Sequence, residues 1–172
     1  MSELLAQRLT EIDELQSREG WHRDGEMLPT LYALVGSNLD VVEYPVHEGL
    51  WKLPLRPGQH LKFLATLLRY ARSKTADGET TIRGFVFATE AWMVTAGREG
   101  EDELMEFARE RRISEHPERV EIRLTTGVLA DGSENTLSHA RGQEATFLGE
   151  GADGEVLAGL RAVVEALKDE DR

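Results

Sequence analysis

The sequence contains no cysteine, which excludes a disulfide framework, a zinc site with thiolate ligands and a cysteine nucleophile. It also lacks any apolar run that approaches the roughly 20 residues needed to span a bilayer. Its first residues carry acids where a secretory signal peptide would carry bases before an apolar core. We therefore expect a cytoplasmic protein that has no contact with membranes.

Basic residues are scarce: 20 Lys and Arg oppose 32 Asp and Glu, which gives a formal net charge of -12. Such an excess of acid favours solubility and disfavours nonspecific contact with nucleic acids or anionic lipids. The motifs of phosphate-binding loops, zinc proteases, calcium-binding loops and serine hydrolases are also missing from the sequence. We therefore expect no cofactor, and no local motif indicates an enzyme class.

The hydrophobic content is sufficient for one well-buried core, because 40% of the 172 residues are apolar. We predict one globular domain over residues 1–172. The segment 97–115 is rich in charge and poor in apolar anchors, so we expect it to be a mobile excursion that contains a short helix.

Hydrophobic periodicity predicts the order of the secondary-structure elements. The expected elements are a helix between Ser2 and Gly20, a hairpin of strands 31–36 and 39–44, a helix over 58–73, strands over 82–94, 120–128 and 135–148, and a helix from about residue 153. The strand 82–94 is apolar on both faces, which is typical of a central strand, and the last strand is expected to bulge near Gly142. Hairpin-linked strands with helices gathered on one face indicate an α+β fold with a single antiparallel sheet of about five strands flanked by helices.

This order of elements resembles that of the roadblock and profilin-like folds, and the resemblance implies a fold but no activity. Three short motifs carry a second resemblance: Gly20-Trp21, Thr89-Glu90-Ala91-Trp92, and the run from Ser114 to Glu121. They are similar to those of an uncharacterised protein family of actinobacteria and their phages, over most of residues 20–125. This resemblance implies a source and no chemistry.

Glu90 is the most informative candidate residue, because it interrupts the apolar strand 82–94. We predict that it is largely buried and paired, since an isolated buried carboxylate is costly. One explanation is a structural ion pair with an arginine such as Arg119 or Arg123. The other is a catalytic or metal site formed by carboxylates and imidazoles: Glu90, His116, Glu121 and, for a metal, also His139. Because the spacing is not diagnostic of metal ligands, we favour the ion pair.

A basic segment is the second candidate, since residues 49–76 hold six cations and no acid. These cations are Lys52, Arg56, Lys62, Arg69, Arg72 and Lys74. They could bind an acidic partner or a phosphate backbone, or they could pair within the chain with the acidic terminal helices. We favour the internal role, because no aromatic residues accompany the cations in the pattern of a nucleic-acid-binding surface.

Aromatic residues are the third candidate. They could line a pocket or an interface, or they could stabilise the core. The residues concerned are Trp21, Tyr32, Tyr44, Trp51 and Trp92. We favour packing in the core.

We interpret the chain as a noncatalytic protein-interaction or accessory module of a bacterium or phage, which binds another protein or a second copy of itself. A homodimer is predicted because the final helix has an apolar stripe wider than one contact within the chain requires. The stripe comprises Val156, Leu157, Leu160, Val163, Val164 and Leu167. The first alternative is a small metal-assisted hydrolase centred on Glu90, His116 and Glu121. The second is a nucleic-acid accessory protein that uses the basic segment 52–74.

Overall fold

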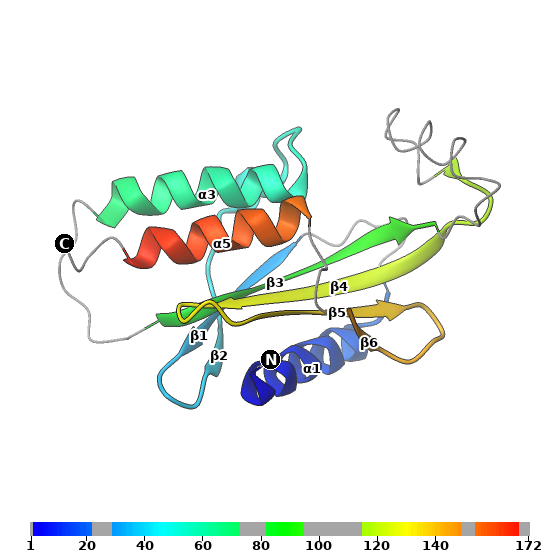
Figure 1. Cartoon of the computed structure of the whole chain (residues 1–172). Coiled ribbons are helices and arrows are strands. Elements are labelled where there is room, and N and C mark those ends of the chain that lie inside the picture. Colours follow the sequence, from blue (N-terminus) through cyan, green and yellow to red (C-terminus); the bar gives the residue numbers. More distant parts are fainter. Residues whose placement is uncertain (1, 22–28, 73–81, 95–114, 149–153, 169–172) are drawn as a thin grey trace.

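The computed structural model describes residues 2–21, 29–72, 82–94, 115–148 and 154–168. Within these ranges the chain forms one antiparallel sheet of six strands in the order β2-β1-β3-β4-β5-β6, flanked by helices (Figure 1). The strands are β1 (Thr30–Val35), β2 (Asp40–Glu43), β3 (Ile82–Met93), β4 (Val120–Leu129), β5 (Glu134–Ala140) and β6 (Thr146–Leu148). The helices are α1 (Glu3–Glu19), α2 (Glu48–Trp51), α3 (Pro57–Arg72) and α5 (Glu155–Lys168). The predicted α+β class with a single antiparallel sheet is confirmed.

The helices cover both faces of the sheet, whereas we expected them on one face (Figure 1). α1 packs against β4 and β5 on one face, and α3 and α5 lie side by side on the other. The apolar stripe of a helix shows which side of the helix is buried, but it carries no information on which face of a sheet receives it. The expectation of one covered face was therefore wrong, and both faces contribute to the core.

β3 lies inside the sheet between β1 and β4, as the sequence predicts. Its residues 85–88 have no exposed surface. Because successive side chains of a strand point to opposite faces, Val86 and Ala88 pack on the side of α1, while Phe85 and Phe87 pack on the side of α3 and α5. Burial on both sides accounts for the continuous apolar run.

The segment 135–148 forms two strands, where we expected one strand with a bulge. β6 pairs antiparallel with β5 after a sharp reversal. At this reversal Gly142 has a φ of 79°, a left-handed conformation that glycine adopts without a steric penalty from Cβ. The Gln143 N–H donates to the Ala140 carbonyl oxygen over 2.9 Å. Gly142 therefore marks a turn, and the turn supplies the sixth strand.

α3 and α5 run parallel to each other (Figure 1) and approach closely at their first turns. A Cβ atom added to Gly58 would lie 2.2 Å from the Glu155 carbonyl oxygen, and one added to Gly159 would lie 2.7 Å from the Gly58 carbonyl oxygen. Both neighbours are backbone atoms, which cannot rotate away. The absence of a side chain at these two glycines therefore sets the distance between the helices.

The apolar stripe of α5 belongs to the core and is not an open surface. It packs against α3 and against β3 and β4. Its best-buried residues are at most 6% exposed: Leu157, Leu160, Val163 and Val164. The reason we gave for a homodimer through this stripe is therefore wrong, because the chain itself covers these four residues of the stripe.

No helix in the described ranges is long and apolar enough to cross a membrane. Of the predicted excursion at 97–115, residues 97–114 lie outside the described residues.

Candidate functional site

Glu90 is held by Arg123 on the neighbouring strand. The two residues lie directly opposite each other in the register of β3 and β4, so their side chains project from the same face of the sheet. Arg123 Nη2 donates to Glu90 Oε1 over 3.0 Å, and neither side chain has any exposed surface. The predicted burial and pairing of Glu90 are confirmed, and the partner is Arg123. Arg119, the other arginine we considered, lies with its guanidinium 5.1 Å from the ring centre of Trp92.

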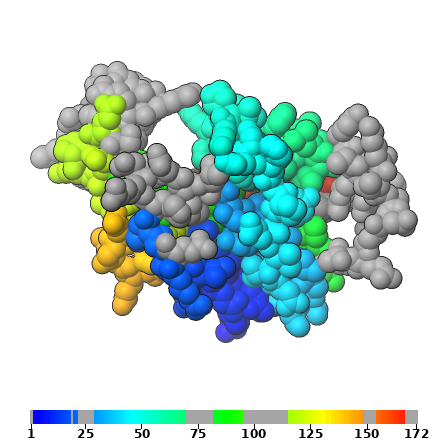
Figure 2. Space-filling view, turned by 180° about the vertical axis from the view of Figure 1, so that it is seen from behind, coloured from blue at the N-terminus to red at the C-terminus, as the bar shows by residue number. Residues whose placement is uncertain are grey.

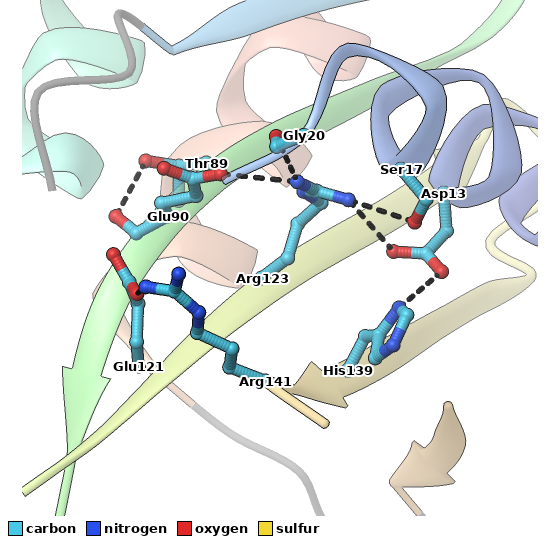
Figure 3. A network of polar contacts seen from close by, with 9 residues as sticks. All are labelled: Asp13, Ser17, Gly20, Thr89, Glu90, Glu121, Arg123, His139 and Arg141. Carbon is cyan, nitrogen blue, oxygen red and sulfur yellow. Dashed lines mark hydrogen bonds and ion pairs between the residues drawn. The ribbon is translucent and has the colours of Figure 1, made fainter. Parts of the chain in front are cut away.

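The end of α1 completes the surroundings of Arg123 (Figure 3). Arg123 Nη1 donates to Ser17 Oγ over 3.0 Å, and Nη2 also donates to the Gly20 carbonyl oxygen over 3.1 Å. The guanidinium lies 4.7 Å from the ring centre of Trp21, within the range of a cation–π contact. One buried cation thus connects the two central strands to the last turn of the helix that covers them.

Asp13 and His139 extend this arrangement to β5 (Figure 3). His139 lies opposite Arg123 in the register of β4 and β5, and its Nδ1 is 2.7 Å from Asp13 Oδ2. The other carboxylate oxygen, Asp13 Oδ1, is 3.9 Å from Arg123 Nη1. The rings of Trp21 and His139 pack edge to face with their centres 5.8 Å apart. We name these residues the Arg123 cluster: Asp13, Ser17, Gly20, Trp21, Glu90, Arg123 and His139.

Our sequence analysis missed Asp13, although the sequence contains a signal for it. The buried side of α1 continues from Leu9 and Ile12 to Asp13 and Gln16, and the last two residues are each 4% exposed. A carboxylate in the buried stripe of a helix needs a partner for the same reason as a carboxylate on an apolar strand. The reasoning that identified Glu90 on β3 would therefore have identified Asp13 on α1.

The residues that we considered for a metal or catalytic site have separate partners. Glu121 lies on the same sheet face as Glu90, but its Oε2 accepts a hydrogen bond from Arg141 Nη1 over 2.8 Å. His116 lies before β4, where its Nδ1 accepts the Glu118 N–H over 3.1 Å. Within the part of the chain that the structure describes, no three His, Asp or Glu side chains are arranged to hold a metal ion. The two carboxylates of the candidate set are thus bound by two different arginines.

Two cations of the basic segment pair with acids of the same chain. Lys52 forms an ion pair with Glu48, one helical turn earlier. The hydrogen bond that the Lys52 ammonium donates in this pair holds the pKa of the Glu48 carboxyl below its usual value. Arg56 Nη1 lies 3.3 Å from Glu155 Oε1 at the start of α5. The pairing of Arg56 agrees with the internal role that we favoured, because it joins the basic segment to the acidic C-terminal helix.

α3 also presents large apolar side chains to solvent. Phe63 and Leu67, one helical turn apart, are 43% and 41% exposed. Leu53 and Leu55 in the preceding loop are 40% and 38% exposed. His60 Nε2 lies 3.1 Å from the Leu53 carbonyl oxygen, so the loop is held against the helix. The buried apolar stripe of this helix comprises Leu61, Leu64, Ala65 and Leu68. Phe63 and Leu67 fall outside this stripe, which is the sequence signal that we overlooked.

We name this surface the α3 face. It comprises four apolar residues and two exposed cations: Leu53, Leu55, Lys62, Phe63, Leu67 and Arg69. Figure 2 shows the segment from α2 into α3, in cyan, as a continuous part of the molecular surface. The side chain of Arg72 and all of Lys74 lie outside the described residues, so they are not part of this definition.

The aromatic candidates on β1, after β2 and in α2 pack against the interior. The Trp51 ring centre lies 5.8 Å from that of Phe87, and the Tyr44 ring meets Phe85 edge to face at 5.3 Å. Tyr32 is 7% exposed. Core packing, which we favoured, is confirmed for Tyr32, Tyr44 and Trp51.

The fold and the Arg123 cluster define an α+β protein that has helices on both faces of an antiparallel sheet and, on the face covered by α1, a buried arginine between carboxylates. The family model of the PPA1309-like proteins matches residues 74–169, more than half of the chain, and the chain belongs to this family. The match fits the predicted membership of an uncharacterised family, whose distribution in actinobacteria and phages stays a prediction. No curated protein and no solved structure matches the chain, so the likeness to the roadblock and profilin-like folds also stays a prediction.

Proposed function

We propose that this protein is a noncatalytic interaction or accessory module and that it binds a protein partner through the α3 face. The observation that carries this proposal is the exposure of Phe63 and Leu67 within the segment 49–76, which holds six cations and no acid. Large apolar side chains that gather on one exposed surface are typical of protein contact sites. The α3 face therefore offers apolar anchors beside positive charge.

The charge of the α3 face indicates the chemistry of the partner. Lys62 and Arg69 are exposed on α3, in a chain whose net charge is -12. Complementary charge speeds association and orients the two surfaces. We therefore propose a partner surface that presents apolar side chains among acids. A second copy of this chain carries many acids elsewhere, so a homodimer in which the α3 face contacts an acidic surface of the second copy belongs to the proposal.

The Arg123 cluster supports a role without catalysis. A general acid or base must come within hydrogen-bonding distance of a substrate. Glu90 and Arg123 have no exposed side-chain surface, and the last turn of α1 contacts Arg123 directly. This geometry is typical of a structural ion pair that joins two parts of a fold.

A double substitution on the α3 face tests the proposal. Immobilised protein captures partners from an extract of the cells that produce it, and the purified candidate is then titrated by calorimetry. We expect the variant with Phe63→Ser and Leu67→Ser to bind at least about ten-fold more weakly, because truncation of anchor residues typically costs more than about 1 kcal/mol each. Phe147→Ser is the matched control, since it truncates a side chain that is 36% exposed and lies opposite Leu137, on the face of the sheet that α1 covers.

The other outcomes separate the alternatives. Equal affinity of the double variant and the wild type would contradict the proposed contact. Retention on nucleic acid that disappears with added salt would favour the nucleic-acid alternative. Stoichiometric zinc or manganese in the purified protein would favour the hydrolase alternative. Light scattering over a dilution series distinguishes a second copy from a different protein.

A further inference from the structure

We infer that the open edge of β2, together with the groove between β2 and α1, binds an extended basic segment of a partner protein as an additional strand. This surface is separate from the α3 face and does not depend on it. Among the described residues, β2 lies at the end of the sheet and pairs with β1 alone. The unused hydrogen-bonding groups of an edge strand are a template for another extended chain.

The hydrogen-bond pattern of the hairpin identifies the backbone groups that face this edge. The Tyr44 N–H donates to the Leu31 carbonyl oxygen over 2.8 Å. In an antiparallel pair, positions that exchange hydrogen bonds alternate with positions that do not. The backbone groups of Val42 therefore face β1, whereas those of Val41 and Glu43 face the open side of β2.

An apolar groove accompanies these backbone groups. It has a volume of about 290 Å³ and is lined by Glu11, Ile12, Glu14, Leu15, Arg18 and Val41. Figure 2 shows α1, in dark blue, beside the β1–β2 hairpin at the surface of the molecule. Residues that lie opposite each other on neighbouring strands point to the same face. A residue paired with Val41 would therefore direct its side chain towards Leu15, which is 47% exposed.

Charge indicates that the added strand is basic. Glu14, Asp40 and Glu43 are exposed around the edge and the groove, and Arg18 is the cation in the groove lining. Glu11 is already bound by Arg8, whose hydrogen bond holds the pKa of the Glu11 carboxyl below its usual value. The carboxylates repel the same edge of a second copy and attract lysine or arginine side chains. The expected occupant thus alternates apolar and basic residues.

The probe is a short blocked peptide in which valine and lysine alternate, added to the full-length protein. We expect binding in the micromolar range and about ten-fold slower hydrogen exchange at the amides of Val41 and Glu43, because both become bonded in the new pair. Glu43→Pro should weaken binding about ten-fold, since it removes an edge N–H that the hairpin does not use. Glu43→Ala is the matched control, because it removes the charge and keeps the N–H, and it should weaken binding about three-fold or less.

Three results would overturn the inference. The first is unchanged peptide affinity in Glu43→Pro. The second is equal binding of a peptide in which glutamate replaces lysine. The third is protection of the Val41 and Glu43 amides that rises with protein concentration without peptide, which would assign the edge to a second copy. If the peptide does not bind the wild-type protein, the strand site is contradicted but the proposed binding through the α3 face is not, because the two surfaces are tested with different probes.

Discussion

Replacing Glu90 with alanine should lower the free energy of unfolding by about 3–5 kcal/mol, because the change leaves a buried charge without its partner. Arg123 has no exposed side-chain surface, and Glu90 Oε1 is the carboxylate oxygen that accepts its hydrogen bond. Glu90→Gln keeps the shape and an acceptor oxygen, so its loss should be smaller, about 1–2 kcal/mol. Urea unfolding monitored by circular dichroism measures both values.

A double variant supplies the control. Glu90→Leu combined with Arg123→Met removes both charges of the pair, and its loss of stability should be smaller than that of Glu90→Ala, because no buried arginine is left without Glu90 and Asp13 keeps its contact with His139 Nδ1. Equal and near-zero changes of the urea midpoint for Glu90→Ala and Glu90→Gln would contradict the burial of this pair.

Introducing a methyl group at Gly58 should destabilise the protein by about 2–3 kcal/mol, because overpacking at this position forces α3 and α5 apart. The added Cβ of Gly58→Ala would lie 2.2 Å from the Glu155 carbonyl oxygen. Gly159→Ala meets the Gly58 carbonyl oxygen at 2.7 Å and should act in the same direction. Thermal unfolding of the variants measures these losses.

Gly154→Ala is the control for this contact, because a Cβ at this exposed glycine would have nothing within 4 Å. Its effect should stay below about 1 kcal/mol. If Gly58→Ala unfolds at the same temperature as Gly154→Ala, the close approach of the two helices does not exist.

Strand periodicity was sufficient to predict the central strand and the burial of Glu90. Both faces of β3 are covered, so the strand is apolar at successive positions whichever helices cover it, and this run can be recognised from sequence. The sequence could not show whether Arg123 or Arg119 pairs with Glu90, because the pairing depends on the register of β3 and β4. The 26 residues from 94 to 119 separate these strands along the chain, so no short turn sets that register from sequence.

Two features of the fold were ambiguous in the sequence for physical reasons. A glycine can adopt the left-handed conformation that a bulge requires and the one that a turn requires. Gly142 therefore did not show that the chain reverses there and forms a sixth strand. The stripe of α5 was read as wide enough for a partner, although α3 and the sheet both cover it. A stripe width gives the amount of surface to be buried, but it does not say whether the covering surface belongs to the same chain.

One titration separates a structural Arg123 cluster from a functional one. The partner captured by the wild-type protein is titrated into Glu90→Gln, whose urea transition first establishes that it is folded. We predict a dissociation constant within about two-fold of the wild-type value, because Glu90 binds Arg123 beneath α1, whereas α3 lies on the opposite side of the sheet from α1 (Figure 1). A folded Glu90→Gln protein that no longer binds this partner would contradict the assignment of binding to the α3 face and of a structural role to the cluster.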